Sequence, residues 1–387
     1  MNSKIRLEGW GIPALFMLCR LILLITMPLE GLRGYGDFVH FFRLAQLGWP
    51  FLDYWVEFPP VFPFISTILF RLASGREHVY DYSLVFLLSL IQTLELALFI
   101  RLVKKLKWQD SATWRVWIYF AVLLVLPFGW WYFDAIAVLG LLLGLFWFFE
   151  NKDIPGALAI SLGILTKLFP VLALPAFWRY WSMKKAIINI AIIFGCVGFV
   201  YLLLWRINPE YSVASLKSQA MKGSWETIWA LVDGNFNTGN FGPEYQRRDP
   251  ESGLVPTANP SRLPAWLTII PFLAMGGWLF WRAKINQPLE VINFVGLTFC
   301  IFFLWSPGWS PQWVLYLIPL ILLGLPEKEA WLFVIVMVLI NLLEWPVFLS
   351  RGFVWGLWIT ILVRTGLFLL LGYQFYVNFR VKKFQIS

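Results

Sequence analysis

Three carboxylates lie close together in a short polar stretch near the start of the chain: Asp37, Asp53 and Glu57. The stretch is rich in aromatic residues and proline, which can order a loop and partly remove its acids from water. A carboxylate in such a setting could act as a general base on a substrate hydroxyl, and the three together could instead hold a divalent cation such as Mg²⁺ or Mn²⁺. The alternative for any single acid is a solvated loop residue.

The residues from Asp37 to Leu47 must position these acids, and they have the spacing of a helix. Their predicted apolar face consists of Phe38, Phe41, Phe42 and Ala45. Such a pattern is typical of an interfacial helix that lies along the membrane surface. His40 on this helix could stack on or hydrogen-bond a sugar, although a histidine beside Phe41 could equally be a packing residue.

The composition indicates an all-α integral membrane protein. Hydrophobic residues make up 59% of the chain and charged residues only 14%, with a mean hydropathy of +0.70. Apolar runs of about 18 or more residues read as membrane spans, and their number permits about 10–12 transmembrane helices. We expect one multi-pass domain over residues 1–387. The net charge of +9 is explained by basic short loops, so no nucleic-acid partner is expected.

Two polar segments interrupt the apolar runs: a first outer loop at residues 29–59 and a second outer loop at residues 206–262. The second loop has a candidate interfacial helix between Ser212 and Val232. The excess of lysine and arginine in the other short loops predicts that both outer loops lie on the extracytoplasmic face of the cell membrane.

The front half of the chain fits this orientation only with two irregular segments. Pro59 to Leu72 would cross only part of the membrane, and Gly156 to Trp178 would break near Lys167, where Pro170 interrupts helical hydrogen bonding. The lysines at 104–107 would then be cytoplasmic, and Asp134 and Lys167 would share the outer face with the acidic loop. In the alternative topology both segments are plain spans and these lysines lie outside.

The order of features in the first loop resembles the GT-C superfamily of membrane glycosyltransferases, in particular its bacterial and archaeal mannosyltransferase-like branch. The residues that carry this resemblance are Asp37, Phe41-Phe42, Gly48, Pro50-Phe51, Asp53-Tyr54, Glu57 and Pro59-Pro60. Two later segments are similar to elements of that family: Thr166 to Pro170, and Ser306 to Pro319. The chain departs from the family where Trp130 to Asp134 replaces a polar glutamine-asparagine element.

The resemblance implies a GT-C-type bundle that transfers a hexose, with mannose as the first expectation, from a polyprenyl-phosphate donor. The acceptor would be a lipid or glycan outside the cytoplasm, the product would be inverted, and membrane lipids would surround the protein. Asp37 is implied as the general base, with Asp53 and Glu57 as the other candidates. The implied substrate-binding residues are His40, Arg43, Tyr54, Asp134, Lys167, Arg247, Arg248 and Gln312.

The cations in that set differ in how strongly the sequence supports them. A lysine in an apolar run, such as Lys167, costs about 2.5–3.5 kcal/mol on insertion scales and is seldom retained without a role. Arg247 and Arg248 could grip a departing phosphate, but they could equally be a solvated loop pair.

Other functions remain open. A transporter or flippase of lipid-linked sugars would be expected to show repeated halves and polar sites at the middle of the membrane. A polymerase or ligase of lipid-linked glycans is the nearest enzyme alternative. No internal repeat is visible, and the acids gather at one interface, which favours an enzyme.

Four more charges fall inside apolar runs: Arg20, Glu95, Glu344 and Arg364. They could line a polar pathway through the bundle. The interpretation we favour is pairing of an arginine with a glutamate on a neighbouring helix.

Overall fold

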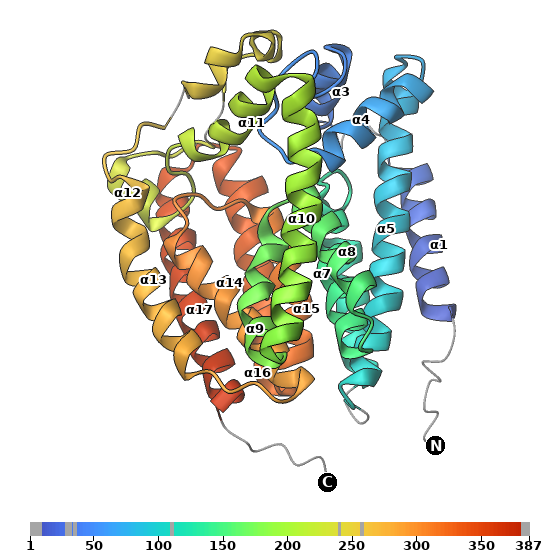
Figure 1. The fold of residues 1–387 in the computed structure, drawn as a ribbon. Coiled ribbons are helices and arrows are strands. Elements are labelled where there is room, and N and C mark those ends of the chain that lie inside the picture. The colour runs from blue at the N-terminus through green and yellow to red at the C-terminus, as the bar shows by residue number, and fades with distance from the viewer. Residues whose placement is uncertain are drawn as a thin grey trace. The chain divides into compact units, whose positions relative to one another are not determined.

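Every regular element in the described part of the chain is a helix, which confirms the expected all-α class. The computed structural model describes residues 10–27, 33, 37–108, 112–238, 241–255 and 259–380 (Figure 1). Residues 29–32 and 34–36, which begin the predicted first outer loop, lie outside the described residues.

Several helices are long and apolar enough to cross a membrane. Among the described residues five segments meet this condition: α5 (Glu77–Lys105), α10 (Met183–Ile207), α14 (Pro288–Trp305), Glu327–Leu349 and α17 (Val354–Arg380). Other apolar helices are shorter, so the total of about 10–12 spans stays a prediction. The chain has the character of a membrane protein.

The chain packs into two compact units. The first contains the described parts of residues 1–170, 191–221 and 242–255, and the second contains those of residues 171–190, 222–241 and 256–387. Helix α10 begins in the second unit and ends in the first.

The core of the first unit is an antiparallel pair of helices, α7 (Asp134–Phe149) and α8 (Asp153–Thr166). Helix α7 packs on α5, as do α1 (Gly11–Thr26) and α6 (Ala112–Val125). A Cβ atom at Gly140 of α7 would come within 2.9 Å of the Ala159 carbonyl oxygen, so the small residue allows the close approach of α7 and α8.

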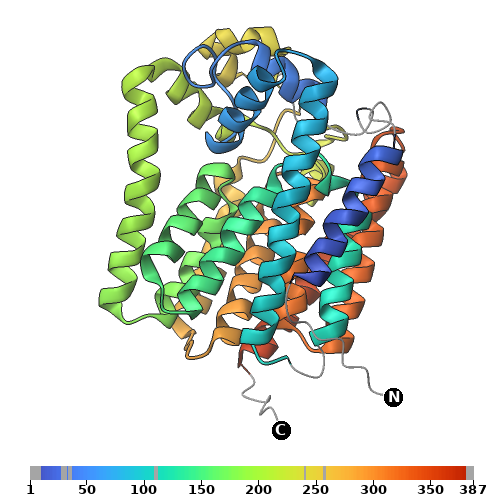
Figure 2. The ribbon, with the colours of Figure 1, turned by 90° about the vertical axis from the view of Figure 1, so that its right-hand side faces the viewer.

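Short helices cover one end of the first unit. They are α3 (Phe38–Gln46), α4 (Val61–Leu72), α11 (Pro209–Met221), η3 (Glu244–Arg248) and η4 (Pro250–Leu254), and a further turn, η1 (Pro127–Gly129), precedes α7. Figures 1 and 2 show α3 and α4 at the N-terminal end of α5, where the Phe42 ring lies 5.4 Å from the ring of Tyr80. Helix α4 has 12 residues and so spans only about 18 Å, too short for the apolar core of a membrane.

Each end of the first unit carries a lysine paired with an acid, and α7 shows which residues lie at which end. At one end Lys105 of α5 pairs at 2.7 Å with Glu150, which follows α7. Asp134 begins α7 and therefore lies at the other end, about 24 Å away along a helix of this length. The first loop lies at the Asp134 end, because Phe41 contacts Phe133, the residue before Asp134. Lys105 and the first loop therefore lie at opposite ends of the unit, whereas the topology with two plain spans would place them at the same end. Which end faces the cytoplasm stays a prediction.

The predicted break near Lys167 is confirmed. Helix α8 ends at Thr166, and Lys167 has an extended backbone with φ −157°. The chain then forms the 3₁₀ turn η2 (Phe169–Ala173), which contains Pro170, before α9 (Leu174–Tyr180) begins. Proline removes a backbone donor, which favours this ending.

The second unit is a bundle in which α14 is central. It packs against α9, α13 (Ala265–Arg282), α15 (Val314–Gly324) and α17. Helix α16 (Glu327–Leu342) continues into η6 (Leu343–Leu349), a π-helical segment that contains Pro346. The unit also contains η5 (Pro311–Trp313) and α12 (Ile228–Asp233). The candidate helix between Ser212 and Val232 is therefore two helices, α11 and α12.

Candidate functional site

Helix α3 carries the first group of candidate residues. Asp37 immediately precedes the helix and is half-buried, and its carbonyl oxygen accepts a hydrogen bond from the Phe41 amide at 2.8 Å. The predicted apolar face is confirmed, because Phe38, Phe41, Phe42 and Ala45 are all buried. His40 and Arg43 remain on the more exposed side.

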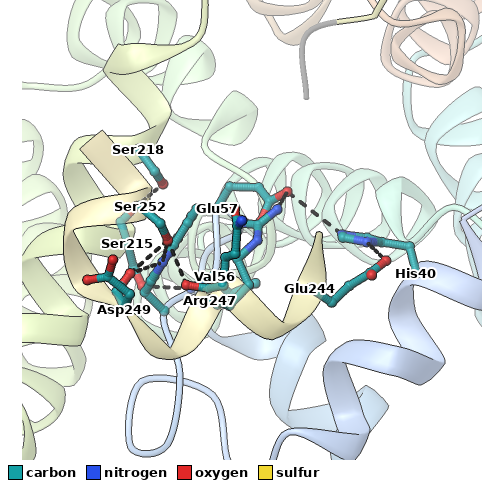
Figure 3. A network of polar contacts seen from close by, with 11 residues as sticks. His40, Val56, Glu57, Ser215, Ser218, Glu244, Arg247, Asp249 and Ser252 are labelled. Atoms are coloured by element: carbon teal, nitrogen blue, oxygen red, sulfur yellow. Dashed lines mark hydrogen bonds and ion pairs between the residues drawn. The ribbon is translucent and has the colours of Figure 1, made fainter. Parts of the chain in front are cut away.

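A chain of ion pairs runs from α3 to η3, as Figure 3 shows. His40 Nδ1 lies 3.0 Å from Glu244 Oε1, and His40 Nε2 lies 3.8 Å from Glu57 Oε1. Arg247 donates to both Glu57 oxygens, at 2.6 and 3.1 Å. Its guanidinium also lies 4.1 Å from the Trp55 ring, within cation–π range. The geometry thus brings His40, Glu57 and Arg247 together, with Glu244 as an added partner.

The pKa values in this network favour the charged forms. Burial disfavours the His40 imidazolium, but its hydrogen bonds to Glu244 and Glu57 outweigh this and raise the pKa of His40 to about 9. The hydrogen bond from His40 lowers the pKa of Glu244 to about 2. Both groups are therefore charged at neutral pH.

The three acids of the first loop have different surroundings. Asp53 accepts a hydrogen bond from the Trp49 amide at 2.6 Å and packs on Gly48, whose φ of +128° suits glycine. A Cβ atom at Gly48 would come within 2.2 Å of the Asp53 carboxylate. Asp53 therefore stabilises a turn and Glu57 binds Arg247. Asp37 lies close enough to His40 to act on it electrostatically.

The acids do not converge as a metal site. In the described ranges, no group of three or more His, Cys, Asp or Glu side chains is placed to hold a metal ion. The Asp37, Asp53 and Glu57 cluster considered from the sequence is therefore not formed.

Asp134 and Lys167 form a second charged group. The Lys167 ammonium lies 2.9 Å from both Asp134 carboxylate oxygens, and Asp134 is fully buried. Asp134 is the first residue of α7, where the helix dipole stabilises a negative charge. The helix break turns Lys167 toward this partner.

Phe133 connects the two charged groups. Its ring stacks on Phe62 at 4.1 Å and makes edge contacts with Phe58 and Phe41, the neighbour of His40. Lys167 Nζ lies 5.1 Å from the centre of the same ring. An aromatic cluster therefore separates the His40–Glu57–Arg247 network from the Asp134–Lys167 pair.

The remaining candidates have varied surroundings. Tyr54 is buried in an apolar cluster with Phe51 and Val56, and burial raises the pKa of its phenol. Arg248 is exposed and donates to the Leu47 carbonyl oxygen at 3.3 Å. Gln312 lies in η5 of the second unit and is nearly buried.

The sequence reasoning missed the contacts that join the first loop to the segment from Glu244 to Ser252. The Trp55 indole donates to the Asp249 carbonyl oxygen and to Ser252, both at 2.9 Å, and Ser215 accepts from the Val56 amide at 3.0 Å. The position of Glu244, one helical turn before Arg247, could have predicted an ion-pair network in this segment, because an acid beside two arginines is typical of one.

The chain matches no protein-family model, and a comparison with curated proteins finds no similar sequence.

Proposed function

We propose that this protein is a membrane glycosyltransferase of GT-C type. It transfers a hexose, with mannose as the first expectation, from a polyprenyl-phosphate donor to an extracytoplasmic lipid or glycan acceptor. The observation that carries the proposal is the charged network of the first unit, where Asp37 lies close to His40, and His40 connects through Glu57 to Arg247. The opposite end of the same unit carries Lys105.

Asp37 is the general base in this proposal. The acceptor oxygen attacks the anomeric carbon while the bond from that carbon to the phosphate oxygen breaks. Asp37 takes the proton of the acceptor hydroxyl, and polyprenyl phosphate leaves with the electron pair, which inverts the anomeric centre. Glu57 is less suited to the role because Arg247 occupies both of its oxygens, and Asp53 accepts from the Trp49 amide.

Exposed arginines are the best candidates for the donor phosphate. The Arg43 side chain is 59% exposed. Arg248 donates to the carbonyl oxygen of Leu47, a residue one helical turn after Arg43. Arginine binds phosphate oxygens in a bidentate fashion, and a cation near the developing charge stabilises the leaving group.

Arg247 is already paired with Glu57 and acts as a positioning residue. Lys167 can contribute less, since Asp134 neutralises it.

The proposal is tested with purified protein in detergent micelles and a panel of radiolabelled sugar donors. We expect transfer from a polyprenyl-phosphate hexose and none from the matching nucleotide sugar. Arg43→Gln and Arg248→Gln should raise the KM for the donor, whereas Arg351→Gln, an exposed arginine of the second unit, should not. Transfer from the nucleotide sugar alone, or from no donor, would contradict the proposal.

A flippase or transporter remains the alternative from another class. The observation that favours it is a buried arginine on α1: Arg20 is fully buried and donates to Ser89 and to the Gly129 carbonyl oxygen. A buried charge within a spanning bundle is typical of a transport pathway. Movement of intact donor across a vesicle membrane, without transfer, would favour this alternative.

A further inference from the structure

A second set of charged residues lies in the second unit and plays no part in the proposed reaction. Glu226 is just before α12, Glu344 is in η6, and Arg364 is in α17. All three are nearly or fully buried, with exposures of 3%, 0% and 2%. Glu226 has a φ of +51°, a conformation uncommon for a residue with a side chain.

Arg364 serves both neighbours. Its guanidinium forms an ion pair with Glu344 and donates to the backbone carbonyl oxygen of Glu226. It also lies 4.9 Å from the centre of the Trp309 ring. The carboxyl group of Glu226 is therefore not the group that Arg364 neutralises.

Arg364 contacts both residues, so the carboxyl groups of Glu226 and Glu344 are neighbours, and the negative charge of one acts on the other. Neither Glu226 oxygen has a donor within hydrogen-bonding distance among the described residues. Two carboxylates cannot hydrogen-bond to each other, because both are acceptors, and a buried acceptor without a donor is strongly unfavourable. A single proton removes this conflict, because a protonated carboxyl group donates to its neighbour.

The charge balance leads to the same conclusion. The charged groups that face Glu226 from the packed elements are Glu344 and Arg364, so two ionised acids would leave one buried negative charge in excess. On its own segment, Lys222 lies over the Trp225 ring at 5.8 Å, and Asp233 accepts from Ser224 at 2.6 Å. An isolated buried charge is costly, and a carboxyl group in that position takes up a proton instead.

We infer that Glu226 and Glu344 hold one proton between them, and that with Arg364 they form a neutral proton-binding site. Burial and the Glu344 carboxylate raise the pKa of Glu226, which agrees with this geometry.

The site anchors the segment that contains Glu226. The Trp225 amide donates to the Pro307 carbonyl oxygen, the Trp309 amide donates to the Trp225 carbonyl oxygen, and Thr227 donates to Pro307. Loss of the proton would place two ionised carboxylates beside each other and push this segment away from η6 and α17. The turn that contains Pro307 and Trp309 would then lose part of its support. This holds whether or not the protein transfers sugars.

Infrared difference spectroscopy of the full chain in detergent micelles at pH 7 tests the shared proton. The wild type should show a protonated-carboxyl band that is lost in Glu226→Gln and also in Glu344→Gln. The double variant should lose no more of this band than either single variant, because only one proton is shared. Glu327→Gln, an exposed acid on α16, is the matched control and should leave the band unchanged.

The pH dependence of unfolding gives a second readout. The pKa of Glu226 is raised in the folded state above its ordinary value of 4.5, so folded protein keeps a proton that unfolded protein loses. The unfolded-to-folded ratio should therefore rise by up to tenfold per pH unit above pH 4.5, until the folded state also loses the proton. Glu226→Gln should lack this component, and Glu327→Gln should retain it.

Three outcomes would overturn the inference. One is the absence of a protonated-carboxyl band in the wild type at pH 7, which needs no variant. Another is a double variant that loses twice the band of each single variant, which would mean two separate protons. The third is an unfolding midpoint that rises with NaCl but not with choline chloride, together with a protonated-carboxyl band that neither single variant loses. That result would assign the site to a metal cation.

Discussion

The network around His40 and the Glu226–Glu344–Arg364 site differ in how their charges are balanced and in how far they are exposed to water. The first network is partly exposed, and its charges balance: the cations are His40, Arg43 and Arg247, and the acids are Asp37, Glu57 and Glu244. The second site is buried and has one acid more than it has cations. A balanced, accessible network can receive a charged substrate, whereas an unbalanced, closed one requires a proton.

The largest expected effect is on activity. Asp37→Asn removes the proposed base while keeping the shape of the side chain, so we expect turnover to fall by about 10²–10⁴-fold. The protein should remain folded, as judged by an unchanged unfolding midpoint. Asp53→Asn, which keeps an acceptor for the Trp49 amide, is the matched control and should retain most activity. If only the control variant loses activity, the base role moves to Asp53.

The next effect is on stability in the first network. Arg247→Met leaves the nearly buried Glu57 carboxylate without its bidentate partner, so the free energy of unfolding should fall by about 3–5 kcal/mol. Denaturant unfolding in micelles measures this. Arg248→Met should change stability by less than about 0.5 kcal/mol, since Arg248 is exposed. Similar losses in both variants would contradict the description of Arg247 as the buried partner.

Lys167→Met tests whether the second charged group is structural or binds the donor. The single variant leaves buried Asp134 uncompensated and should cost about 3 kcal/mol of stability. The double variant Lys167→Met/Asp134→Asn removes both charges and should recover most of that loss. If the recovered double variant still uses the donor poorly while acceptor use is normal, Lys167 binds the donor. Normal use of both substrates assigns the pair a structural role alone.

The smallest effect is a pH dependence of the first network. The pKa of His40 is raised to about 9, so its stabilising effect is fully present below its ordinary pKa of 6.5 and is lost as the pH rises through 9. The pKa of Glu244 is lowered to about 2, so its stabilising effect is present above 4.5 and is lost as the pH falls through 2. We expect the free energy of unfolding to fall by about 1 kcal/mol at the alkaline end and by a similar amount at the acidic end, because the His40–Glu244 pair is partly exposed.

His40→Gln should remove the alkaline part of this profile and leave the acid denaturation of other groups in place. The measurement is the unfolding midpoint between pH 5 and 10. Because the Glu226 site also loses stability with rising pH, the comparison requires Glu226→Gln as the background. If the unfolding midpoint of the His40→Gln/Glu226→Gln variant still falls at alkaline pH, neither His40 nor Glu226 causes the fall.

Local patterns predicted local structure well. Helical spacing identified the apolar face of α3, and a lysine and a proline within one apolar run indicated where α8 ends. The expectation that a buried arginine pairs with a glutamate on a neighbouring helix, made without naming the pair, is confirmed for Arg364 and Glu344. These predictions depend on neighbours in sequence or on strong energetic constraints.

Contacts between distant residues could not be predicted. Glu57 and Arg247 are 190 residues apart, and His40 and Glu244 are 204 apart, so nothing in either segment indicates the other. The expectation that Arg20 pairs with a glutamate was wrong: Arg20 donates to Ser89 and a backbone carbonyl, and Glu95 accepts from Tyr119. Neutral acceptors can satisfy a buried arginine, and a sequence does not show which of them will be near.

The most direct test of the proposed sugar transfer uses the purified protein in sealed vesicles with a radiolabelled polyprenyl-phosphate hexose and a lipid acceptor. We predict that the label becomes covalently attached to the acceptor and that Asp37→Asn vesicles form no such product. Label that crosses the membrane while still attached to polyprenyl phosphate, at equal rates in wild type and Asp37→Asn, would contradict the account and identify a transporter.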